Sequence, residues 1–153
     1  MSRYKRKKMC LVSSSGGHYE QLRMLKPLAK NHDIFWVTED ADYEVQADYY
    51  IKQIRPGKLN EVLILFLNFF ISLKIWRKEK PDYVITTGTL AAFPMIIIAK
   101  LLRKKVIYIE TFARIYDGTR AGKLMYKVAD LFIIQWETLK EVYPNAVYGG
   151  SIY

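Results

Sequence analysis

Short runs of apolar residues alternate along the chain with segments whose apolar residues recur at helical spacing. The short runs predict strands over residues 9–12, 33–38, 48–54, 82–86, 105–109 and 131–134. The segments between them predict helices over residues 19–30, 58–80, 90–102, 120–129 and 137–142. Most of the strands are apolar on both faces, which is typical of parallel strands covered by helices. The pattern therefore predicts an α/β fold with a single parallel sheet wound by helices.

No repeat, low-complexity segment or linker divides this pattern, so we expect one domain over residues 1–153. A chain of this length is long enough to close its own apolar core. In parallel sheets of this kind, ligands bind beyond the carboxyl ends of the strands. We therefore expect functional residues in the loops 13–18, 38–43, 86–89 and 110–120.

The predicted helix at 58–80 is apolar on almost every side. At about 100° per residue, its polar side chains fall within about 40° of one another. They form one thin stripe of Glu61, Asn68, Ser72 and Glu79. Packing on a sheet uses only one apolar face, so the surplus face must contact something else. The apolar run rises about 22 Å, which is short of a hydrocarbon core of about 30 Å.

We therefore expect this helix to lie in a membrane interface rather than to span the bilayer. The residues expected to contact lipid are Leu65, Phe66, Phe69, Phe70 and Trp76. The alternative is a core helix that another helix or subunit covers on its second side.

The charge of the chain favours an anionic partner. Lys and Arg number 24 against 15 Asp and Glu, which gives a net charge of +9. Basic residues flank the apolar helix, with Lys58 before it and Lys74, Arg77, Lys78 and Lys80 at its end. An anionic membrane surface fits this arrangement. A nucleic-acid-binding module is a weaker alternative, because the apolar helix has no role in it, and we expect no nucleic acid partner.

Cysteine and histidine are scarce, which limits the chemistry. One cysteine, Cys10, excludes an internal disulfide and fits a reducing compartment. The two histidines, His18 and His32, form no metal-binding pattern, so we expect neither a metal nor another cofactor. The apolar stretch at 9–12 is too short for the core of a signal peptide. We expect a peripheral protein on the cytoplasmic face of the cell membrane.

Two loops rich in glycine and hydroxyl groups follow strands at the same edge of the predicted sheet. They contain Ser15, Gly16, Gly17, Thr87, Gly88 and Thr89. Glycines let the backbone approach a ligand closely, and amides at the start of a helix attract phosphate. The spacing is not that of a nicotinamide or flavin site. The loops predict a diphosphate contact, with ordinary strand-to-helix turns as the alternative.

Four charged or titratable residues complete the candidate site. His18 lies near a predicted helix start, which favours a neutral ring that can accept a proton. Glu110 follows a strand and is a rival base or a ligand of sugar hydroxyls. Arg114 and Arg120 are the candidates to clamp a diphosphate in a bidentate way. The structural alternatives are a turn-capping histidine and a local Glu110–Arg114 ion pair.

Taken together, five motifs resemble those of a known family. They are Leu11-Val-Ser-Ser-Ser-Gly-Gly-His18, Ile34-Phe-Trp-Val-Thr38, Asp82-Tyr-Val-Ile-Thr-Thr-Gly88, Ile107-Tyr-Ile-Glu-Thr-Phe-Ala-Arg114 and Val147-Tyr-Gly-Gly-Ser151. The sequence resembles the PssD-like proteins of bacterial exopolysaccharide and capsule biosynthesis. These are similar to the membrane-recruiting subunit of the two-part enzyme that adds the second N-acetylglucosamine to a lipid-linked diphosphate.

The resemblance implies a Rossmann-like unit, the N-terminal acceptor half of a GT-B glycosyltransferase. Such a half resembles the acceptor domain of the peptidoglycan enzyme that acts on a lipid-linked muramyl precursor. The resemblance also implies a polyprenyl-diphosphate-linked sugar acceptor and a separate, PssE-like subunit that binds a UDP-sugar donor. The chain would then be inactive alone, with Ile152 and Tyr153 docking the partner. The alternative is a complete small inverting transferase that acts alone or as a homodimer.

Overall fold

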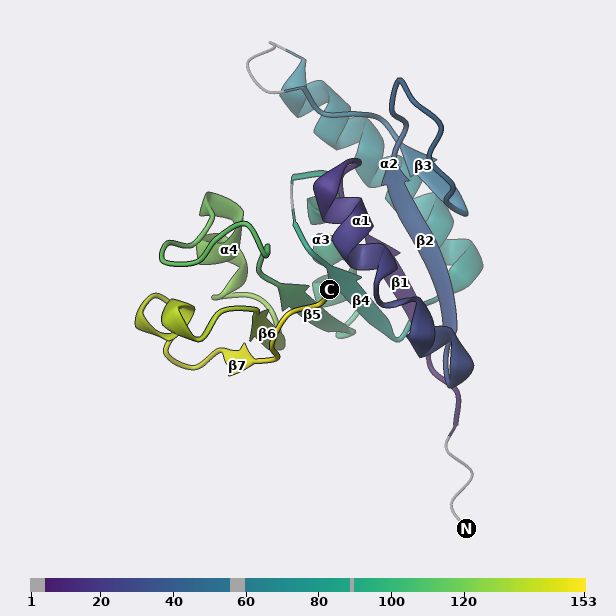
Figure 1. Cartoon of the computed structure of the whole chain (residues 1–153). Helices are drawn as coiled ribbons and strands as arrows, with labels where there is room; N and C mark the ends of the chain where they lie inside the picture. Colours follow the sequence, from purple (N-terminus) through teal and green to yellow (C-terminus); the bar gives the residue numbers. More distant parts are fainter. Residues whose placement is uncertain (1–4, 56–59, 89) are drawn as a thin grey trace.

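In a computed structural model that describes residues 5–55, 60–88 and 90–153, the chain forms a seven-stranded parallel sheet (Figure 1). The strands are β1 (Lys8–Val12), β2 (Asp33–Glu39), β3 (Tyr49–Ile51), β4 (Tyr83–Thr86), β5 (Lys105–Ile109), β6 (Leu131–Ile134) and β7 (Val147–Tyr148). They lie in the order β3-β2-β1-β4-β5-β6-β7, and every neighbouring pair is parallel. The predicted fold class is confirmed, and the structure adds the two-residue strand β7, which the hydrophobic pattern did not predict.

The helices connect these strands. They are α1 (Gly17–Arg23), α2 (Glu61–Glu79), α3 (Phe93–Leu101) and α4 (Arg120–Met125), with 3₁₀ helices η1 (Lys26–Lys30), η2 (Leu90–Ala92) and η3 (Glu137–Glu141). The single helix expected at 19–30 is wrong, because the chain breaks it into α1 and η1. Pro27 lies at the start of η1, and its missing N–H cannot continue an α-helical hydrogen-bond ladder.

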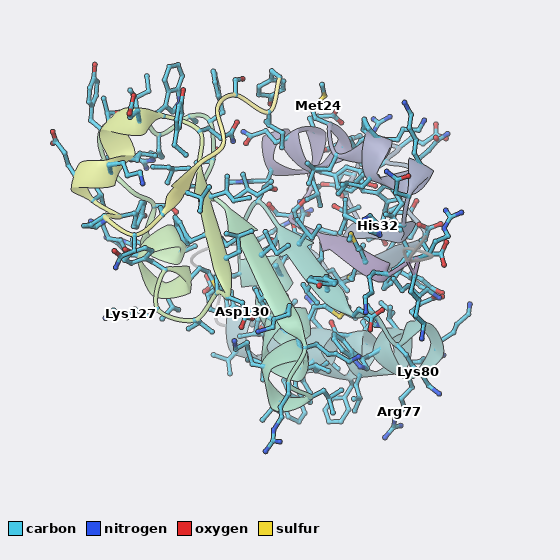
Figure 2. All side chains as sticks on the ribbon, turned by 90° about the horizontal axis from the view of Figure 1, so that it is seen from below. Met24, His32, Arg77, Lys80, Lys127 and Asp130 are labelled. Carbon is cyan, nitrogen blue, oxygen red and sulfur yellow. The ribbon has the colours of Figure 1, made fainter. Side chains whose placement is uncertain are left out.

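The helices cover the two faces of the sheet unequally. On one face, Leu11, Ile85 and Ile109 pack against Tyr19 and Leu22 of α1. The other face is covered by α2 and α3, where strand residues such as Val84 and Val106 share one core with Trp76 and Met95. Figure 2 shows this arrangement, with Met24 after α1 on one side of the sheet and Arg77 and Lys80 at the end of α2 on the other.

The strand order reverses between β1 and β4. From β1 the chain proceeds outward to β2 and β3, and then returns across the sheet through α2 to β4. The loops after β1 and β4 therefore leave in opposite directions at the carboxyl edge, where this class of sheet forms its binding crevice. His18 lies in the first turn of α1, directly after the loop that leaves β1, and Thr87 lies in the loop after β4.

Candidate functional site

His18 and the loop after β4 are joined by a reciprocal pair of hydrogen bonds. His18 Nδ1 lies 2.9 Å from the carbonyl oxygen of Thr87, and the Thr87 hydroxyl donates to the carbonyl of His18 at 2.7 Å. A carbonyl can only accept, so Nδ1 carries the proton of this contact. In the neutral ring Nε2 then keeps the lone pair that a general base requires.

Glycines at two points allow these loops to adopt their shapes. Gly16 has a φ of 82° and Gly88 a φ of 110°, backbone angles that residues with a side chain rarely adopt. A Cβ on Gly88 would lie 3.3 Å from the Tyr108 hydroxyl and 3.5 Å from Cε1 of His18. The Gly88 N–H donates to the Thr86 hydroxyl at 3.0 Å, so in this conformation it is not directed at a phosphate. Thr89 lies outside the described residues.

Glu39 is a site residue that the sequence analysis did not single out. It is buried at the carboxyl end of β2, where its Oε2 accepts from the N–H and the hydroxyl of Ser15 at 3.4 and 3.5 Å. Its Oε1 accepts from the N–H of Ile54 at 3.0 Å. Glu39 thus ties the first glycine loop to the segment after β3. In the sequence, Glu39 is the first of three acidic residues, with Asp40 and Asp42, that follow an apolar strand, and nothing there distinguishes it from the other two.

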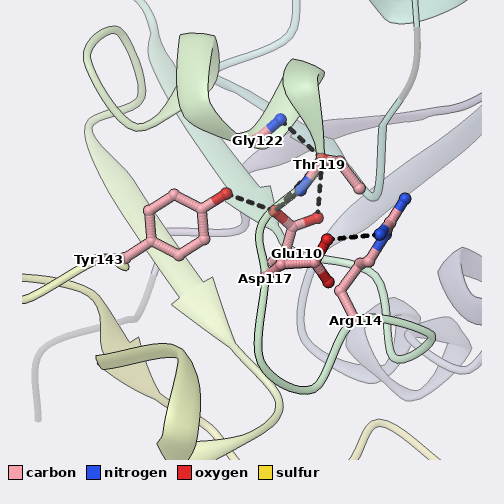
Figure 3. A network of polar contacts seen from close by, with 6 residues as sticks. All are labelled: Glu110, Arg114, Asp117, Thr119, Gly122 and Tyr143. Carbon is pink, nitrogen blue, oxygen red and sulfur yellow. Dashed lines mark hydrogen bonds and ion pairs between the residues drawn. The ribbon is translucent and has the colours of Figure 1, made fainter. Parts of the chain in front are cut away.

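Glu110 lies at the centre of a closed network (Figure 3). Its side chain is fully buried, and its two oxygens accept from the Thr111 N–H at 3.0 Å, the Thr119 N–H at 3.2 Å and the Tyr143 hydroxyl at 2.8 Å. The Thr119 hydroxyl also lies within 3.0 Å of Oε1. Burial and the charge of Glu110 raise the pKa of Tyr143. In this arrangement Glu110 organises the loop after β5 and has no exposed oxygen with which to take a proton.

The network leaves no space for additional atoms. A Cβ on Gly122 would lie 1.9 Å from Oε2 of Glu110, and one on Gly118 would lie 1.8 Å from the Tyr143 hydroxyl. The Thr119 hydroxyl also accepts from the Gly122 N–H at 2.8 Å and so caps α4.

The two arginines of this loop are exposed. Arg114 pairs with Asp117 at 2.7 Å, so the local Glu110–Arg114 ion pair considered from the sequence is wrong. Arg120 is the first residue of α4, directly after Thr119. The network of Glu110 therefore positions both arginines on the surface at the carboxyl edge.

Helix α2 presents its apolar side to solvent. We call Val62, Leu63, Phe66, Leu67 and Phe70 the outward face of α2. Val62 is 80% exposed, Phe66 59% and Phe70 53%. A helix on the surface of a soluble protein normally has the opposite polarity.

The polar stripe of α2 instead faces the sheet. Asn68 and Ser72 are buried, and the Asn68 amide donates to the carbonyl and accepts from the N–H of Lys52, both at 2.8 Å. Lys52 follows β3, the edge strand, whose backbone groups would otherwise lack partners.

The structure separates the residues expected to contact lipid. Phe66 and Phe70 belong to the outward face, whereas Leu65 and Phe69 are half-buried. The expectation for Trp76 is wrong: it is 5% exposed and lies in the core with Ile75. Over the part of the chain that the structure describes, no helix has the length and apolarity needed to cross a bilayer.

The C-terminal residues return to the sheet. The Ile152 N–H donates to Oε1 of Gln135 at 2.9 Å, and its side chain packs on the α1 side of the core. Tyr153 is 61% exposed, and its ring meets that of Phe112 edge-on with 5.4 Å between centroids. Ile152 thus anchors the tail, and Tyr153 is presented at the surface.

The described residues bring together no group of three His, Cys, Asp or Glu side chains that could hold a metal ion. Cys10 lies in β1, where burial raises the pKa of its thiol well above the ordinary value.

Comparison of the sequence with known families finds a match over residues 50–152 to the family described as oligosaccharide biosynthesis protein Alg14 like. The rat UDP-N-acetylglucosamine transferase subunit ALG14 is 33% identical over 121 residues, which cover 75% of this chain and 56% of the rat protein. The human protein of the same name is 30% identical over 175 residues, covering 93% of this chain and 81% of its own. The chain spans little more than half the length of the rat protein.

Two solved structures share the fold. MurG from Acinetobacter baumannii has a TM-score of 0.70 and 16% identity, over 86% of this chain and 42% of MurG. The UDP-N-acetylglucosamine 2-epimerase from Rickettsia bellii has a TM-score of 0.71 and 17% identity, over 96% of this chain and 45% of the epimerase. The expected resemblance to the N-terminal domain of a GT-B glycosyltransferase is confirmed as a likeness of fold.

Proposed function

Because the chain belongs to the Alg14-like family of oligosaccharide biosynthesis proteins, we propose that it is the acceptor-binding subunit of a two-component, membrane-associated glycosyltransferase. Its acceptor is a sugar linked to a polyprenyl diphosphate, and a separate, PssE-like subunit provides the UDP-sugar. The motifs shared with PssD-like proteins favour a role in exopolysaccharide or capsule biosynthesis.

The observation that carries this proposal is the pairing of His18 with Thr87 at the carboxyl edge of a single sheet unit. This unit corresponds to less than half of MurG. In the proposed assembly, the donor-binding subunit forms the second wall of the crevice. A two-component arrangement agrees with the names of the relatives, which describe a transferase subunit.

In the proposed reaction, Nε2 of His18 accepts the proton of the acceptor hydroxyl. The resulting oxygen nucleophile attacks the anomeric carbon of the donor sugar, the bond from that carbon to the diphosphate breaks, and the nucleoside diphosphate leaves with its electron pair. The carbonyl of Thr87 holds Nδ1–H and stabilises the imidazolium that forms. Inversion at the sugar carbon is the outcome that the family resemblance implies.

The basic and hydroxyl groups of the same edge bind the acceptor diphosphate. Arg120 and Arg114 lie on the exposed surface of the loop that Glu110 holds, and guanidinium groups match phosphate oxygens in pairs. In this proposal, Ser15, Gly16 and Gly17 after β1 and Thr87 and Gly88 after β4 contribute to the same diphosphate site. Glu110 serves as a positioning residue for the arginines.

In this proposal, insertion of the outward face of α2 brings this edge of the sheet to the membrane. Five large apolar side chains exposed on one helix favour insertion into the interface rather than contact with water. Lys74, Arg77 and Lys78 are exposed near the end of the helix, where they attract anionic headgroups. We place the protein peripherally on the cytoplasmic face, where nucleotide sugars are available.

Tyr153 is the proposed contact for the donor-binding subunit, with Ile152 holding the tail in place. Co-purification from cells tests this proposal. A tagged wild-type chain should retain a second protein that binds a UDP-sugar, and Tyr153→Ala should retain less of it because the exposed ring is lost. Tyr116→Ala, which removes another exposed tyrosine, is the matched control. A chain that purifies alone and binds the UDP-sugar tightly by itself contradicts the proposal.

A further inference from the structure

An apolar groove runs between α3 and α4 on the side of the sheet opposite α1. Its walls include Phe93, Ile97 and Leu101 from α3, together with Leu124 and Val128 from α4 and the turn after it. Lys100 is the one charged residue that lines the groove in the described part of the chain, and its ammonium group pairs with Asp130 at 3.1 Å. A ligand in this groove would find almost no hydrogen-bonding partners, so its buried part must be a hydrocarbon.

The groove starts at the carboxyl edge of the sheet. Phe93 is the first residue of α3, which follows the loop of Thr87 through η2, and Leu101 is its last. At 1.5 Å per residue, the nine residues of α3 make a groove about 13 Å long. Arg120 opens α4 at the same edge. One end of the groove therefore lies at the same edge of the sheet as the groups assigned to the acceptor diphosphate.

The charge of the α4 wall is positive. Arg120, Lys123 and Lys127 are exposed, and none of them has an acidic partner among residues 5–55, 60–88 and 90–153. Lys127 lies two residues after the last residue of α4 and is exposed (Figure 2). A molecule with a linear hydrocarbon tail and an anionic head matches both the apolar walls and this charge.

We propose that the groove binds the first part of the isoprenoid chain of a polyprenyl diphosphate, with the diphosphate at the carboxyl edge near Arg120. The proposal rests on the proposed function and identifies the part of the acceptor that lies outside the crevice. Recognition of the chain as well as of the diphosphate distinguishes a lipid-linked acceptor from soluble nucleotides and sugar phosphates. It also draws the acceptor out of the bilayer along a surface that adjoins α2.

The test uses the full chain in vesicle-free buffer, with farnesyl diphosphate and inorganic pyrophosphate as probes in isothermal titration calorimetry. Farnesyl diphosphate should bind at least about tenfold more tightly than pyrophosphate, because burying even two methylene groups has that effect. Ile97→Glu and Leu124→Glu should abolish this advantage and leave pyrophosphate binding unchanged. Both side chains are half-exposed, so the substitutions are compatible with folding. Leu102→Glu, on an exposed neighbour that does not line the groove, is the matched control and should behave as wild type.

Equal affinity for the two probes, no measurable binding of farnesyl diphosphate, or groove variants that bind it like wild type would each overturn the proposal. Equal competition by dihexanoyl phosphatidic acid would also overturn it, because the groove would then hold bilayer lipid. If any of these results appears while the UDP-sugar-binding partner still co-purifies, only the groove assignment fails. Loss of that partner from the wild-type chain contradicts the proposed function instead.

Discussion

The Nδ1 atom of His18 lies 2.9 Å from the carbonyl oxygen of Thr87, where the start of α1 meets the loop after β4 at the reversal of strand order. The contact fixes which nitrogen carries the proton. It also joins the loop after β1 to the loop after β4, since the Thr87 hydroxyl returns a bond to the backbone of His18. A histidine that only capped its own turn would not need a partner 69 residues away.

Replacing His18 by Gln should lower the rate of sugar transfer in the assembled enzyme by about 10²–10⁴-fold, the usual contribution of a general base. Gln can keep a hydrogen bond to the Thr87 carbonyl, so the fold should persist. The control is His32→Gln, which alters the other histidine, directly before β2, and should retain full activity. Transfer by the His18 variant at the wild-type rate would show that the ring takes no proton.

Gly122→Ala should destabilise the protein by about 1–3 kcal/mol, because the new methyl group would overlap Oε2 of Glu110. Chemical denaturation monitored by circular dichroism measures this change. Gly17→Ala is the matched control, since a Cβ there meets no atom within 4 Å, and it should cost less. If the two variants unfold at the same denaturant concentration, the close packing around Glu110 is not as described.

Glu79 makes the free energy of unfolding depend on pH in the acidic range. Hydrogen bonds from Lys8 and Tyr49 lower the pKa of its carboxyl group, and burial opposes them only in part. A lowered folded-state pKa contributes stability above the unfolded value of about 4.3, and this contribution is lost as the pH falls through the folded value. Wild type should therefore lose more stability than Glu79→Gln between about pH 5 and pH 3. Parallel denaturation curves for the two proteins over this range would contradict the assignment.

The double variant Val62→Glu, Phe66→Glu should reduce flotation with anionic liposomes at least about tenfold, because it places two charges on the outward face of α2. Both side chains are exposed, so the change in folding stability should stay small. Met24→Glu introduces the same residue at an exposed position on the opposite side of the sheet and serves as control. If the double variant floats like wild type, the outward face of α2 does not contact the membrane.

The alternation of apolar runs was sufficient to predict the parallel sheet and the carboxyl edge at which its loops meet. It also identified α2 as a helix with too much apolar surface. The hydrophobic pattern could not predict which side of α2 packs against the sheet and which side is exposed. Asn68 turns inward because it pairs with the backbone of Lys52 at the sheet edge, and this rotation carries Trp76 into the core. Basic neighbours made Trp76 resemble an interfacial residue.

The role of Glu110 also could not be predicted from the sequence. Its position after a strand is typical of both a catalytic acid and a structural one. The partner that distinguishes them is Tyr143, 33 residues further along the chain and brought in by the segment after β6. The role of Glu39 likewise depends on contacts that the sequence does not reveal. Its two carboxylate oxygens accept hydrogen bonds from the N–H groups of Ser15 and Ile54, and these bonds hold the first glycine loop in place.

The most direct test of the account is a reconstituted transfer assay with a polyprenyl-diphosphate-linked sugar in anionic liposomes and a UDP-sugar donor. The account predicts no transfer by this chain alone, no transfer by the donor-binding protein alone, and transfer when both are present. Full transfer by the purified chain without any partner would contradict it.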